Sequence, residues 1–575
     1  MFVKKGVFEM IKLVPSVKSM EIKDGFLTKS AIYYKDLNCD QRIIKALEKL
    51  PYSQQGVELE ISIKDVDGEG YELDITQETI QINADSAAGA FYAIQTLRQI
   101  FAHEQIPCLH IKDEPDLKYR GFYQDVTRGK IPTVSTIKSL IDNMAYYKLN
   151  SLQIYVEHVF EFEEYRDLRE TRGFLTKEDI KEIGEYCKEN FIDFIPSLST
   201  FGHLGELLLQ EKFEHLRVLK EFDNPNFWDL RTEHFTIDPL HPESIEVIKS
   251  LIDQYSPNFD SQYFNICCDE TNDLSVYGEQ GEDVGKLYVD FVLKIIKHVK
   301  EKNKTVMMWS DVLCSHPETI DLLPEDTVFL NWEYTANPDE AKIANFAKLN
   351  RKQIVCPGTN TWSRFCEHIE MEESNIPLLA EYGYKYGAIG LLNTNWGDWG
   401  NPCSLELAMY GLVLGAEKSW SVKTQINEEY YNRINFLLYK RSNGVELLKE
   451  LCEFHKNIQW TVFCGNYFAH QNNTPIKPYT LGRVLKVQQK YKAIEEKLTV
   501  EGWENDKYLQ EMVIAAQGVC LIAELSAKMS GEKFERIIDT TQWLNKFSQM
   551  WLKKNKKSEL YRIVDMFTYY ENIGK

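Results

Sequence analysis

The sequence predicts an α/β fold whose central unit is a (β/α)₈ TIM barrel, preceded by a small α/β domain and followed by a helical domain. From about residue 118, short apolar segments alternate with amphipathic helical segments, and after about residue 419 only helical patterns continue. Roughly eight strand-helix units over about 300 residues match the requirement of such a barrel. An open, doubly wound sheet is the competing architecture.

The bulk composition limits the classes of partner and compartment. The 575 residues exceed the size of one hydrophobic core, so several domains are expected. A net charge of −21 disfavours nucleic acid and anionic membranes. The 12 cysteines form no CxxC pair, which is typical of reduced thiols. Because neither a secretory signal nor an apolar run of transmembrane length is evident, a cytoplasmic protein without membrane insertion is predicted.

Residues 1–115 are predicted to form the small α/β domain. Strand-like segments occupy 57–63, 71–75 and 79–82, and residues 86–101 have the apolar spacing of a helix. No residue in this part of the chain indicates chemistry.

Residues 116–420 are predicted to form the barrel. The expected strands are 121–126, 151–156, 191–196, 263–268, 305–309, 328–332, 353–356 and 388–392. The expected helices are 134–147, 177–190, 242–254, 284–302, 340–349 and 405–414. Active residues of such barrels lie at the carboxyl ends of the strands and in the loops that follow.

Residues 421–575 are predicted to form the helical domain, with helices at 428–439, 445–457, 479–498, 507–529 and 535–552. This domain is also the candidate for a homodimer contact, an alternative that the sequence leaves open.

The most informative strand end is Asp269-Glu270, which follows the apolar, β-prone run 263–268. Successive side chains of a strand point to opposite faces, so one acid is expected to enter a pocket and the other to support it from the side. A helix N-terminus, where acids are favoured by the helix dipole, is the structural alternative. Other strand ends supply Glu157, His158, His203, Trp309, Trp332, Tyr334, Asn360, Trp362, Trp396 and Asp398.

Further short motifs follow one another along the chain. They are RGFYQDVTR at 120–128, MAYYKLN at 144–150, FGH at 201–203, the Asp269-Glu270 pair, WSD at 309–311 and NWGD at 395–398. Taken together and in this order, they resemble glycoside hydrolase family 20, the β-N-acetylhexosaminidases. The resemblance covers about residues 1–420, and the combination of motifs is more specific than any one of them. It suggests a divergent, bacterial-type branch.

The resemblance implies a retaining exo-β-N-acetylhexosaminidase that removes terminal, non-reducing β-linked GlcNAc or GalNAc from glycans or glycoconjugates. A carboxyl group in an aromatic, water-poor pocket beside another carboxylate has a raised pKa, and Glu270 is the candidate acid. In the substrate-assisted mechanism that the family implies, the 2-acetamido oxygen attacks the anomeric carbon and forms an oxazolinium intermediate. Asp269 is expected to orient the acetamide, and no cofactor is required.

The resemblance also implies roles for the other candidates. Arg120 is expected to bind sugar hydroxyls, with a surface salt bridge as its alternative role. Trp309, Trp332, Trp362 and Trp396 are expected to wall the pocket, although a tryptophan at such a position is ordinarily part of a core. Asp398 is expected to accept hydrogen bonds from O4 or O6, and His203 to support the acid.

The chain departs from the family pattern in ways that leave the choice between GlcNAc and GalNAc open. Many members have a His-rich second strand followed by paired aspartates; here Glu157 and His158 are the candidates for that pocket wall. The tyrosine that holds the acetamide carbonyl has no single counterpart, so Tyr334, Asn360 and Trp362 stay candidates. Asp398 stands where a glutamate is more usual.

Two other functions compete with this prediction. A metal-dependent hydrolase would use His158, His203, Asp269 and Glu270 as ligands, but no fixed-spacing motif such as HExxH supports it. A glycan-binding barrel without catalytic activity is the non-enzyme alternative. The intact acid pair favours the enzyme.

Overall fold

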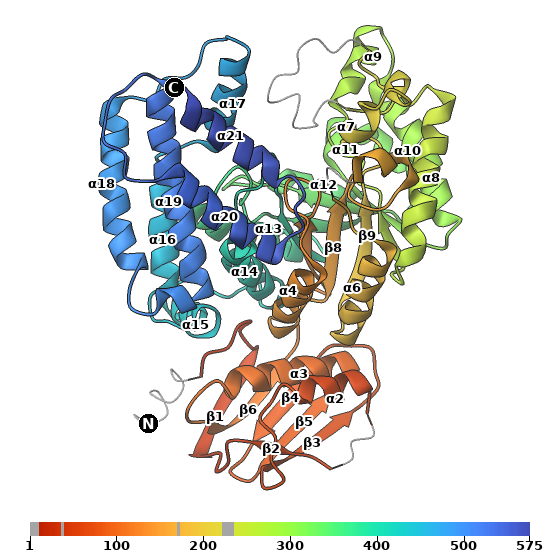
Figure 1. Cartoon of the computed structure of the whole chain (residues 1–575). Helices are drawn as coiled ribbons and strands as arrows, with labels where there is room; N and C mark the ends of the chain where they lie inside the picture. The colour runs from red at the N-terminus through yellow and green to blue at the C-terminus, as the bar shows by residue number, and fades with distance from the viewer. Residues whose placement is uncertain (1–10, 36–38, 170–172, 221–234, 575) are drawn as a thin grey trace.

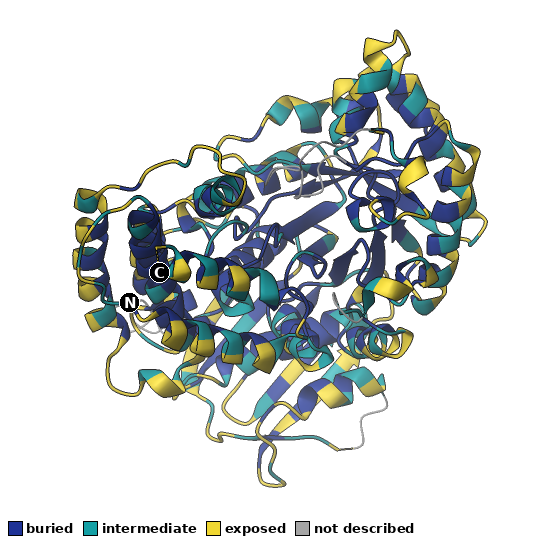
Figure 2. Ribbon diagram, turned by 45° about the horizontal axis from the view of Figure 1, so that its top comes forward, coloured by how far each residue is buried: buried dark blue, intermediate teal, exposed yellow. Residues whose placement is uncertain are grey.

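The computed structural model describes residues 11–35, 39–169, 173–220 and 235–574. Three groups of elements follow one another along the chain: a mixed sheet with two helices, a closed barrel and a set of helices (Figure 1). Buried residues fill the strands of the barrel and the inner helices, whereas exposed residues lie on the outer helix faces (Figure 2).

The first group is a six-stranded sheet in the order β1-β6-β4-β5-β3-β2. Its elements are β1 (Ser19–Phe26), β2 (Ile32–Tyr33), α2 (Gln41–Leu47), β3 (Val57–Ile63), β4 (Tyr71–Ile75), β5 (Thr79–Ala84), α3 (Ala87–Ile100) and β6 (Pro107–Asp113). The alternating burial of β3 and β4 and the buried apolar face of α3 explain their packing, because the sheet and the helix each bury one face.

The second group is a closed barrel of parallel strands, in which β14 pairs with β7. This closure confirms the TIM barrel and excludes the open sheet. The strands are β7 (Tyr119–Asp125), β8 (Ser151–Val156), β9 (Asp193–Leu198), β10 (Tyr263–Asn265), β11 (Thr305–Trp309), β12 (Val328–Trp332), β13 (Lys352–Cys356) and β14 (Gly390–Asn395).

The barrel helices agree with the predicted set except for one helix that was not predicted and one that begins later than predicted. They are α4 (Val134–Tyr146), α6 (Lys177–Glu189), α8 (Pro242–Tyr255), α10 (Val284–Lys300), α12 (Glu340–Lys348), α13 (Ile369–Lys385) and α14 (Met409–Trp420). Helix α13 was not predicted and contains Pro377, a residue that normally interrupts a helix. Residues 405–408, predicted as the start of a helix, form a separate 3₁₀ turn before α14.

The third group is helical and follows α14. It contains α15 (Glu428–Ile434), α16 (Gly444–His455), α17 (Trp460–Gln471), α18 (Leu481–Leu498), α19 (Lys507–Met529), α20 (Thr540–Lys554) and α21 (Leu560–Asn572). By length and composition α19 resembles a membrane span, contrary to the sequence prediction, but 83% of its most apolar window is buried in the structure. It packs against both α18 and α20 as the central helix of this group.

The N-terminal sheet domain is joined to the amino ends of the barrel strands by buried polar contacts. Lys148 Nζ lies 3.0 Å from Asp113 Oδ2, and the indole N–H of Trp420 donates to the same carboxylate. Both members of this ion pair are buried, so loss of one would leave the other uncompensated. The opposite, carboxyl ends of the strands therefore face away from this domain.

Candidate active site

The carboxyl ends of the barrel strands surround a cavity of about 160 Å³. Its lining residues are Arg128, Tyr155, His203, Asp269, Glu270, Trp332, Tyr334, Trp362, Trp396 and Asp398. All except Arg128 and Tyr155 were candidates from the sequence. The acid pair and the aromatic residues are therefore brought to one place by the barrel.

The backbone that presents the acid pair leaves the strand early. Strand β10 ends at Asn265, whose side-chain oxygen accepts a hydrogen bond of 2.9 Å from the Cys267 amide. Cys267, Cys268 and Glu270 then adopt left-handed backbone angles, with φ of 56°, 66° and 48°. The prediction of a regular strand through residue 268 is therefore wrong, although the Ile266 amide and the Cys267 carbonyl still bond the backbone of β11.

A close approach by the loop after β9 supports this turn. A Cβ atom at Gly202 would lie 2.4 Å from the carbonyl oxygen of Asp269, so only glycine fits there. The next residue, His203, has a left-handed φ of 57° and is buried. The sequence Gly202-His203 thus allows the imidazole to reach the acid pair.

His203 Nε2 lies 3.4 Å from Asp269 Oδ2 and 3.2 Å from Glu270 Oε2. Burial alone would lower the pKa of His203, but the two carboxylates raise it well above 6.5. The Asp269 side chain is 12% exposed and that of Glu270 is 37% exposed. Glu270 is thus the acid more open to a ligand, while Asp269 is held deeper.

A third carboxyl group lies next to the pair. The Glu270 amide donates a hydrogen bond of 2.9 Å to Asp311 Oδ2. Burial, followed by the charge of Asp269, raises the pKa of Asp311 to about 7. Asp311 begins the short helix α11 (Asp311–Ser315) after β11. Through the hydrogen bond from the Glu270 amide, its carboxyl group holds the backbone of Glu270 in place.

Aromatic side chains form one wall of the cavity. Trp332 and Tyr334 stack with ring centroids 5.1 Å apart, and Trp362 packs 5.0 Å from Tyr334. The indole N–H of Trp396 donates to the Tyr334 hydroxyl at 2.7 Å. These contacts fix a rigid, half-buried aromatic surface beside the acids, which suits the apolar face of a sugar ring.

Arg128 supplies a second positive charge beside that of His203, although no role for Arg128 was predicted from the sequence. Its Nε donates to Asp125 Oδ2 at 2.8 Å, and its Nη1 donates to Asp398 Oδ1 at 3.2 Å. Burial opposes the charge of Arg128, but these carboxylates raise its pKa. The guanidinium lies over the rings of Tyr155 and Trp396, at 5.2 and 5.0 Å. The sequence did offer one indication that Arg128 lies in the site, because it ends the segment 120–128 and so follows the strand predicted there.

Arg120 does not lie in the cavity, and the expectation that it binds sugar hydroxyls is corrected. It is fully buried at the start of β7, where Nη1 donates to Glu69 of the N-terminal domain at 2.6 Å and Nε to the Lys148 carbonyl at 3.0 Å. The amino and carboxyl ends of a barrel strand are on opposite sides of the barrel. Arg120 therefore joins two domains.

Glu157 and His158 do not line the cavity either. The buried Glu157 carboxylate accepts a hydrogen bond of 2.8 Å from the Tyr155 hydroxyl, and burial is the main cause of its raised pKa. His158 Nδ1 lies 3.9 Å from the Glu157 carboxylate. Tyr155, which bonds Glu157, lines this part of the cavity instead.

Trp309 and Asn360 are the remaining predicted residues outside the lining. Trp309 is fully buried inside the barrel, with its ring 5.3 Å from Tyr123 and 5.9 Å from Trp396. It lies in the barrel core next to the pocket-lining Trp396. The Asn360 amide donates to the Gly358 carbonyl at 3.0 Å within its own loop. Its expected contact with an acetamide is therefore not supported, which leaves Tyr334 and Trp362.

The ligand atoms of His203, Asp269 and Glu270 lie close enough together to hold a metal ion. His158, the fourth ligand of the metal-dependent hypothesis, does not belong to this group. His203 Nε2, Asp269 Oδ2 and Glu270 Oε2, which a metal ion would need as ligands, already pair with one another. The arrangement equally provides a proton donor beside a carboxylate, which is the requirement for acid-assisted bond cleavage.

A TIM barrel with an acid pair, a histidine and an aromatic wall at its carboxyl end defines a hydrolase-type carbohydrate site. Models of "Glycosyl hydrolase family 20, catalytic domain" and of "domain 2" of the same family match residues 117–376 and 10–114. Together they cover well over half of the chain. The chain belongs to glycoside hydrolase family 20.

Similar proteins agree with this family. A Beta-hexosaminidase from Porphyromonas gingivalis is 28% identical over 65% of this chain and 50% of that protein. A Lacto-N-biosidase from Bifidobacterium bifidum is 24% identical over 64% of this chain and 32% of that protein. The chain thus spans half or less of the length of these two relatives.

Solved structures confirm the fold. A chitobiase from Flavobacterium johnsoniae superposes with a TM-score of 0.64 at 18% identity, covering 94% of this chain and 96% of that one. A β-N-acetylhexosaminidase from Bacteroides fragilis has a TM-score of 0.59 at 20% identity, covering 75% of this chain and 95% of that one. The first match extends through the helical group.

Proposed function

We propose that the protein is a retaining exo-β-N-acetylhexosaminidase, which hydrolyses terminal, non-reducing β-linked GlcNAc or GalNAc in glycans or glycoconjugates. The observation that carries the proposal is the placement of Asp269 and Glu270 around His203 beside an aromatic wall. Family membership and relatives named Beta-hexosaminidase support the same activity.

The chemistry follows from the different exposure of the two acids. Glu270, the more open one, donates its proton to the glycosidic oxygen as the bond to the anomeric carbon breaks. The substrate's acetamide oxygen attacks the same carbon and forms the oxazolinium ion. Glu270 then takes a proton from water, which attacks the anomeric carbon and restores the acetamide with net retention.

Asp269 is proposed to hold the acetamide N–H and to stabilise its positive charge in the intermediate. Its Oδ2 faces His203, while its other oxygen, Oδ1, is buried and has no hydrogen-bond partner within the described residues. An unsatisfied buried acceptor is costly, so a substrate N–H that pairs with it is favoured. His203 in its charged form keeps this carboxylate oriented.

Sugar recognition is proposed to divide between the two sides of the cavity. Trp332 and Trp362 form the apolar surface, and the Tyr334 hydroxyl is the candidate partner of the acetamide carbonyl. Arg128 and Asp398 form an ion pair at the polar side, where they can exchange hydrogen bonds with O4 or O6. This pair is the element proposed to distinguish GlcNAc from GalNAc.

The proposal is tested by release of nitrophenol from the β-GlcNAc and β-GalNAc aryl glycosides, with the β-glucoside as the matched control that lacks the acetamide. Activity confined to the acetamido sugars, with a product that first appears as the β-anomer, is expected. Equal hydrolysis of the glucoside would overturn the substrate-assisted mechanism. A loss of activity with a chelator, restored by a divalent cation, would favour the metal-dependent alternative at His203, Asp269 and Glu270.

We further propose that the protein works in the cytoplasm. All 12 cysteines are free thiols, and even the neighbouring Cys366 and Cys452 sulfurs stay 3.9 Å apart. The helical group is the proposed surface for any homodimer. Cell fractionation tests the first statement and light scattering the second.

A further inference from the structure

A second large cavity, of about 750 Å³, lies where the three parts of the molecule meet. It is bordered by the ends of α2 and α3 in the N-terminal domain, by the end of α4 on the barrel, and by residues 437–440 and 505–508 of the helical group. None of its lining residues belongs to the catalytic cavity. It has the size of a small-molecule site, and we refer to it as the junction groove.

The junction groove contains an excess of positive charge. Arg98, Lys440 and Lys507 line it, and within the described residues none of them has a carboxylate oxygen within 4.0 Å. A fourth cation, Lys49, is neutralised by Asp142 at 2.7 Å. The other acid of the lining, Asp506, caps α19 and lies 3.3 Å from Arg441. Within the described residues, Lys440 and Lys507 therefore have no ion-pair partner, and Arg98 has only the more distant charge of Asp142.

Lys440 is the least expected of these cations. It has a left-handed φ of 54° at the C-terminal end of the helical turn 435–439, a conformation that residues other than glycine and asparagine seldom adopt. Burial lowers the pKa of its ammonium group, and no acid is among the causes that act on it. An ammonium group without an acidic neighbour at the edge of a cavity is available to a partner of negative charge.

Tyrosine rings form the apolar surface of the junction groove. Arg98 lies 5.0 Å from the ring of Tyr146 on α4, and Tyr439 packs edge-on against Tyr508 at 5.1 Å. Two pairs of tyrosines line the junction groove. The barrel provides Tyr146 and Tyr147, and the helical group provides Tyr439 and Tyr508. Such rings favour a ligand that has a flat or cyclic organic part next to its charge.

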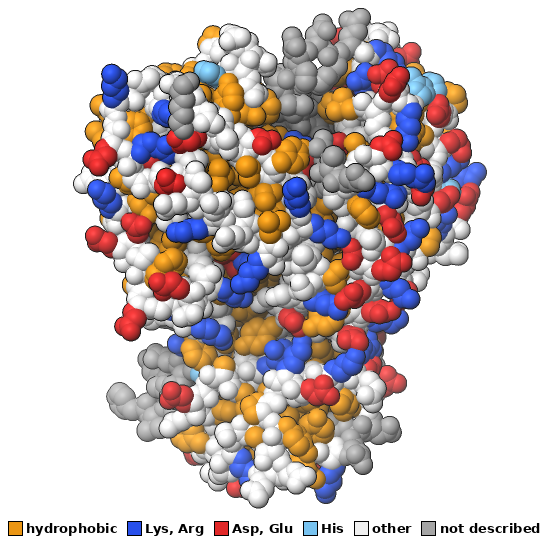
Figure 3. All heavy atoms as spheres, viewed as in Figure 1, with side chains coloured by type: hydrophobic (Ala, Val, Ile, Leu, Met, Phe, Trp, Pro, Cys, Tyr) orange, Lys and Arg blue, Asp and Glu red, His pale blue; other side chains and the backbone are white. Residues whose placement is uncertain are grey.

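We propose that the junction groove binds a small, multiply charged organic phosphate, such as a phosphorylated sugar, through Arg98, Lys440 and Lys507. Lysine and arginine are the usual protein partners of phosphate groups. The net charge of −21 opposes the approach of an anion, so binding of a phosphate depends on these local cations. The space-filling view shows Lys and Arg side chains along the junction between the N-terminal domain and the rest of the molecule (Figure 3). This inference is independent of the proposed catalytic function.

Binding is tested by isothermal titration calorimetry of the full chain with N-acetylglucosamine 6-phosphate, pyrophosphate and inorganic phosphate. N-acetylglucosamine is the uncharged control, although it can also bind the catalytic cavity; for this reason each titration is repeated with Asp269→Asn. Saturable binding of a phosphate probe that weakens as salt increases is expected. Tighter binding of the sugar phosphate than of pyrophosphate would identify the contribution of the tyrosine rings.

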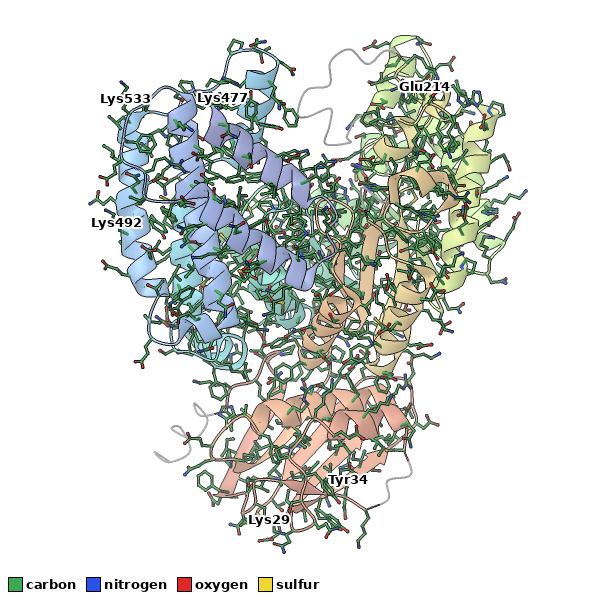
Figure 4. The ribbon with its side chains drawn as sticks, in the orientation of Figure 1. Lys29, Tyr34, Glu214, Lys477, Lys492 and Lys533 are labelled. Carbon is green, nitrogen blue, oxygen red and sulfur yellow. The ribbon has the colours of Figure 1, made fainter. Side chains whose placement is uncertain are left out.

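The location is tested by Lys440→Asn and Lys507→Gln, since asparagine tolerates the left-handed backbone. Each is expected to weaken the phosphate affinity at least tenfold without changing glycosidase activity. Lys533→Gln is the matched control, because Lys533 lies at the far end of the helical group from the N-terminal domain (Figure 4). Absence of saturable binding, or equal affinities for all three variants and the wild type, would overturn the proposal.

Discussion

His203 Nε2 lies 3.2 Å from Glu270 Oε2, so one imidazole joins the open acid to its deeper neighbour. Because carboxylates raise the pKa of His203, the charged imidazolium stabilises the folded protein. This contribution is complete below the unfolded pKa of about 6.5 and is lost as the pH rises through the higher folded value. The His203→Gln variant is therefore expected to lose thermal stability relative to wild type at pH 6, with a smaller difference at pH 10. Equal differences at both pH values would show that the imidazole is uncharged.

The two acids are predicted to differ in their dependence on the leaving group. Glu270→Gln removes the proton donor and is expected to lower kcat by about 10²–10⁴-fold for a methylumbelliferyl or alkyl leaving group. The loss should shrink for dinitrophenol, which departs without protonation. Asp269→Asn should lower kcat for both leaving groups, because it acts on the acetamide. An identical pattern for the two variants would contradict the division of roles.

Asp311 is predicted to make stability fall with increasing pH. Its folded pKa of about 7 exceeds the ordinary aspartate value, so its contribution is full below about pH 4 and is lost between about pH 4 and 7. Asp311→Asn keeps an acceptor for the Glu270 amide and removes the charge. The variant is expected to melt at a higher temperature than wild type at pH 8 and at nearly the same temperature at pH 4. A lower melting temperature at pH 8 would show that the charge is stabilising.

Substitutions of Arg128 and Arg120 are predicted to have different effects on substrate binding and on stability. Arg128→Gln removes a cation of the cavity and leaves the buried Asp125 and Asp398 carboxylates without their partner. It is therefore expected to raise KM at least tenfold and also to lower the melting temperature. Arg120→Gln removes a fully buried guanidinium from the half-buried Glu69, which costs at most about 3–5 kcal/mol of stability, the range for a fully buried pair. Activity assays with melting curves separate the two, and a selective KM effect of Arg120→Gln would restore its role as a sugar ligand.

The connection between α20 and α21 is predicted to position Arg128. The Gly129 amide donates to Glu559 Oε2 at 3.2 Å, and Ser558 Oγ donates to the Gly129 carbonyl at 2.8 Å. Ser558→Ala is therefore expected to raise KM severalfold, with a smaller change in kcat. Ser530→Ala is the control, since Ser530 bonds only within the helical group. Equal kinetics of both variants would show that the loop is rigid without this contact.

Most of the barrel was predictable because its strands are continuous apolar runs. The predicted bounds of β8, β11 and β12 agree with the structure. The early end of β10 was not predictable from apolarity, because it depends on a side-chain turn at Asn265 and on left-handed cysteines. Helix α13 was missed because Pro377 argues against a helix until its neighbours are known.

The sequence predicted which strand ends form the site, but it did not predict which side chain at each strand end faces the cavity. Asp269, Glu270 and Trp396 lie where the barrel rule predicts them. Arg120 and Arg128 stand in one short motif, but a strand rises about 3.3 Å per residue, so they fall at opposite ends of β7. The bounds of β7 therefore distinguish them, because active residues of such barrels follow the carboxyl ends of the strands, where Arg128 lies.

The left-handed residues around the acids have a consequence for protein engineering. His203, Cys267, Cys268, Glu270 and Asp398 all adopt positive φ, where β-branched side chains are strongly disfavoured. A randomised library at these positions would lose most members to misfolding and would retain mainly glycine and asparagine. Libraries that seek a new sugar preference should vary Trp332 and Trp362, whose ordinary backbone leaves side-chain choice free.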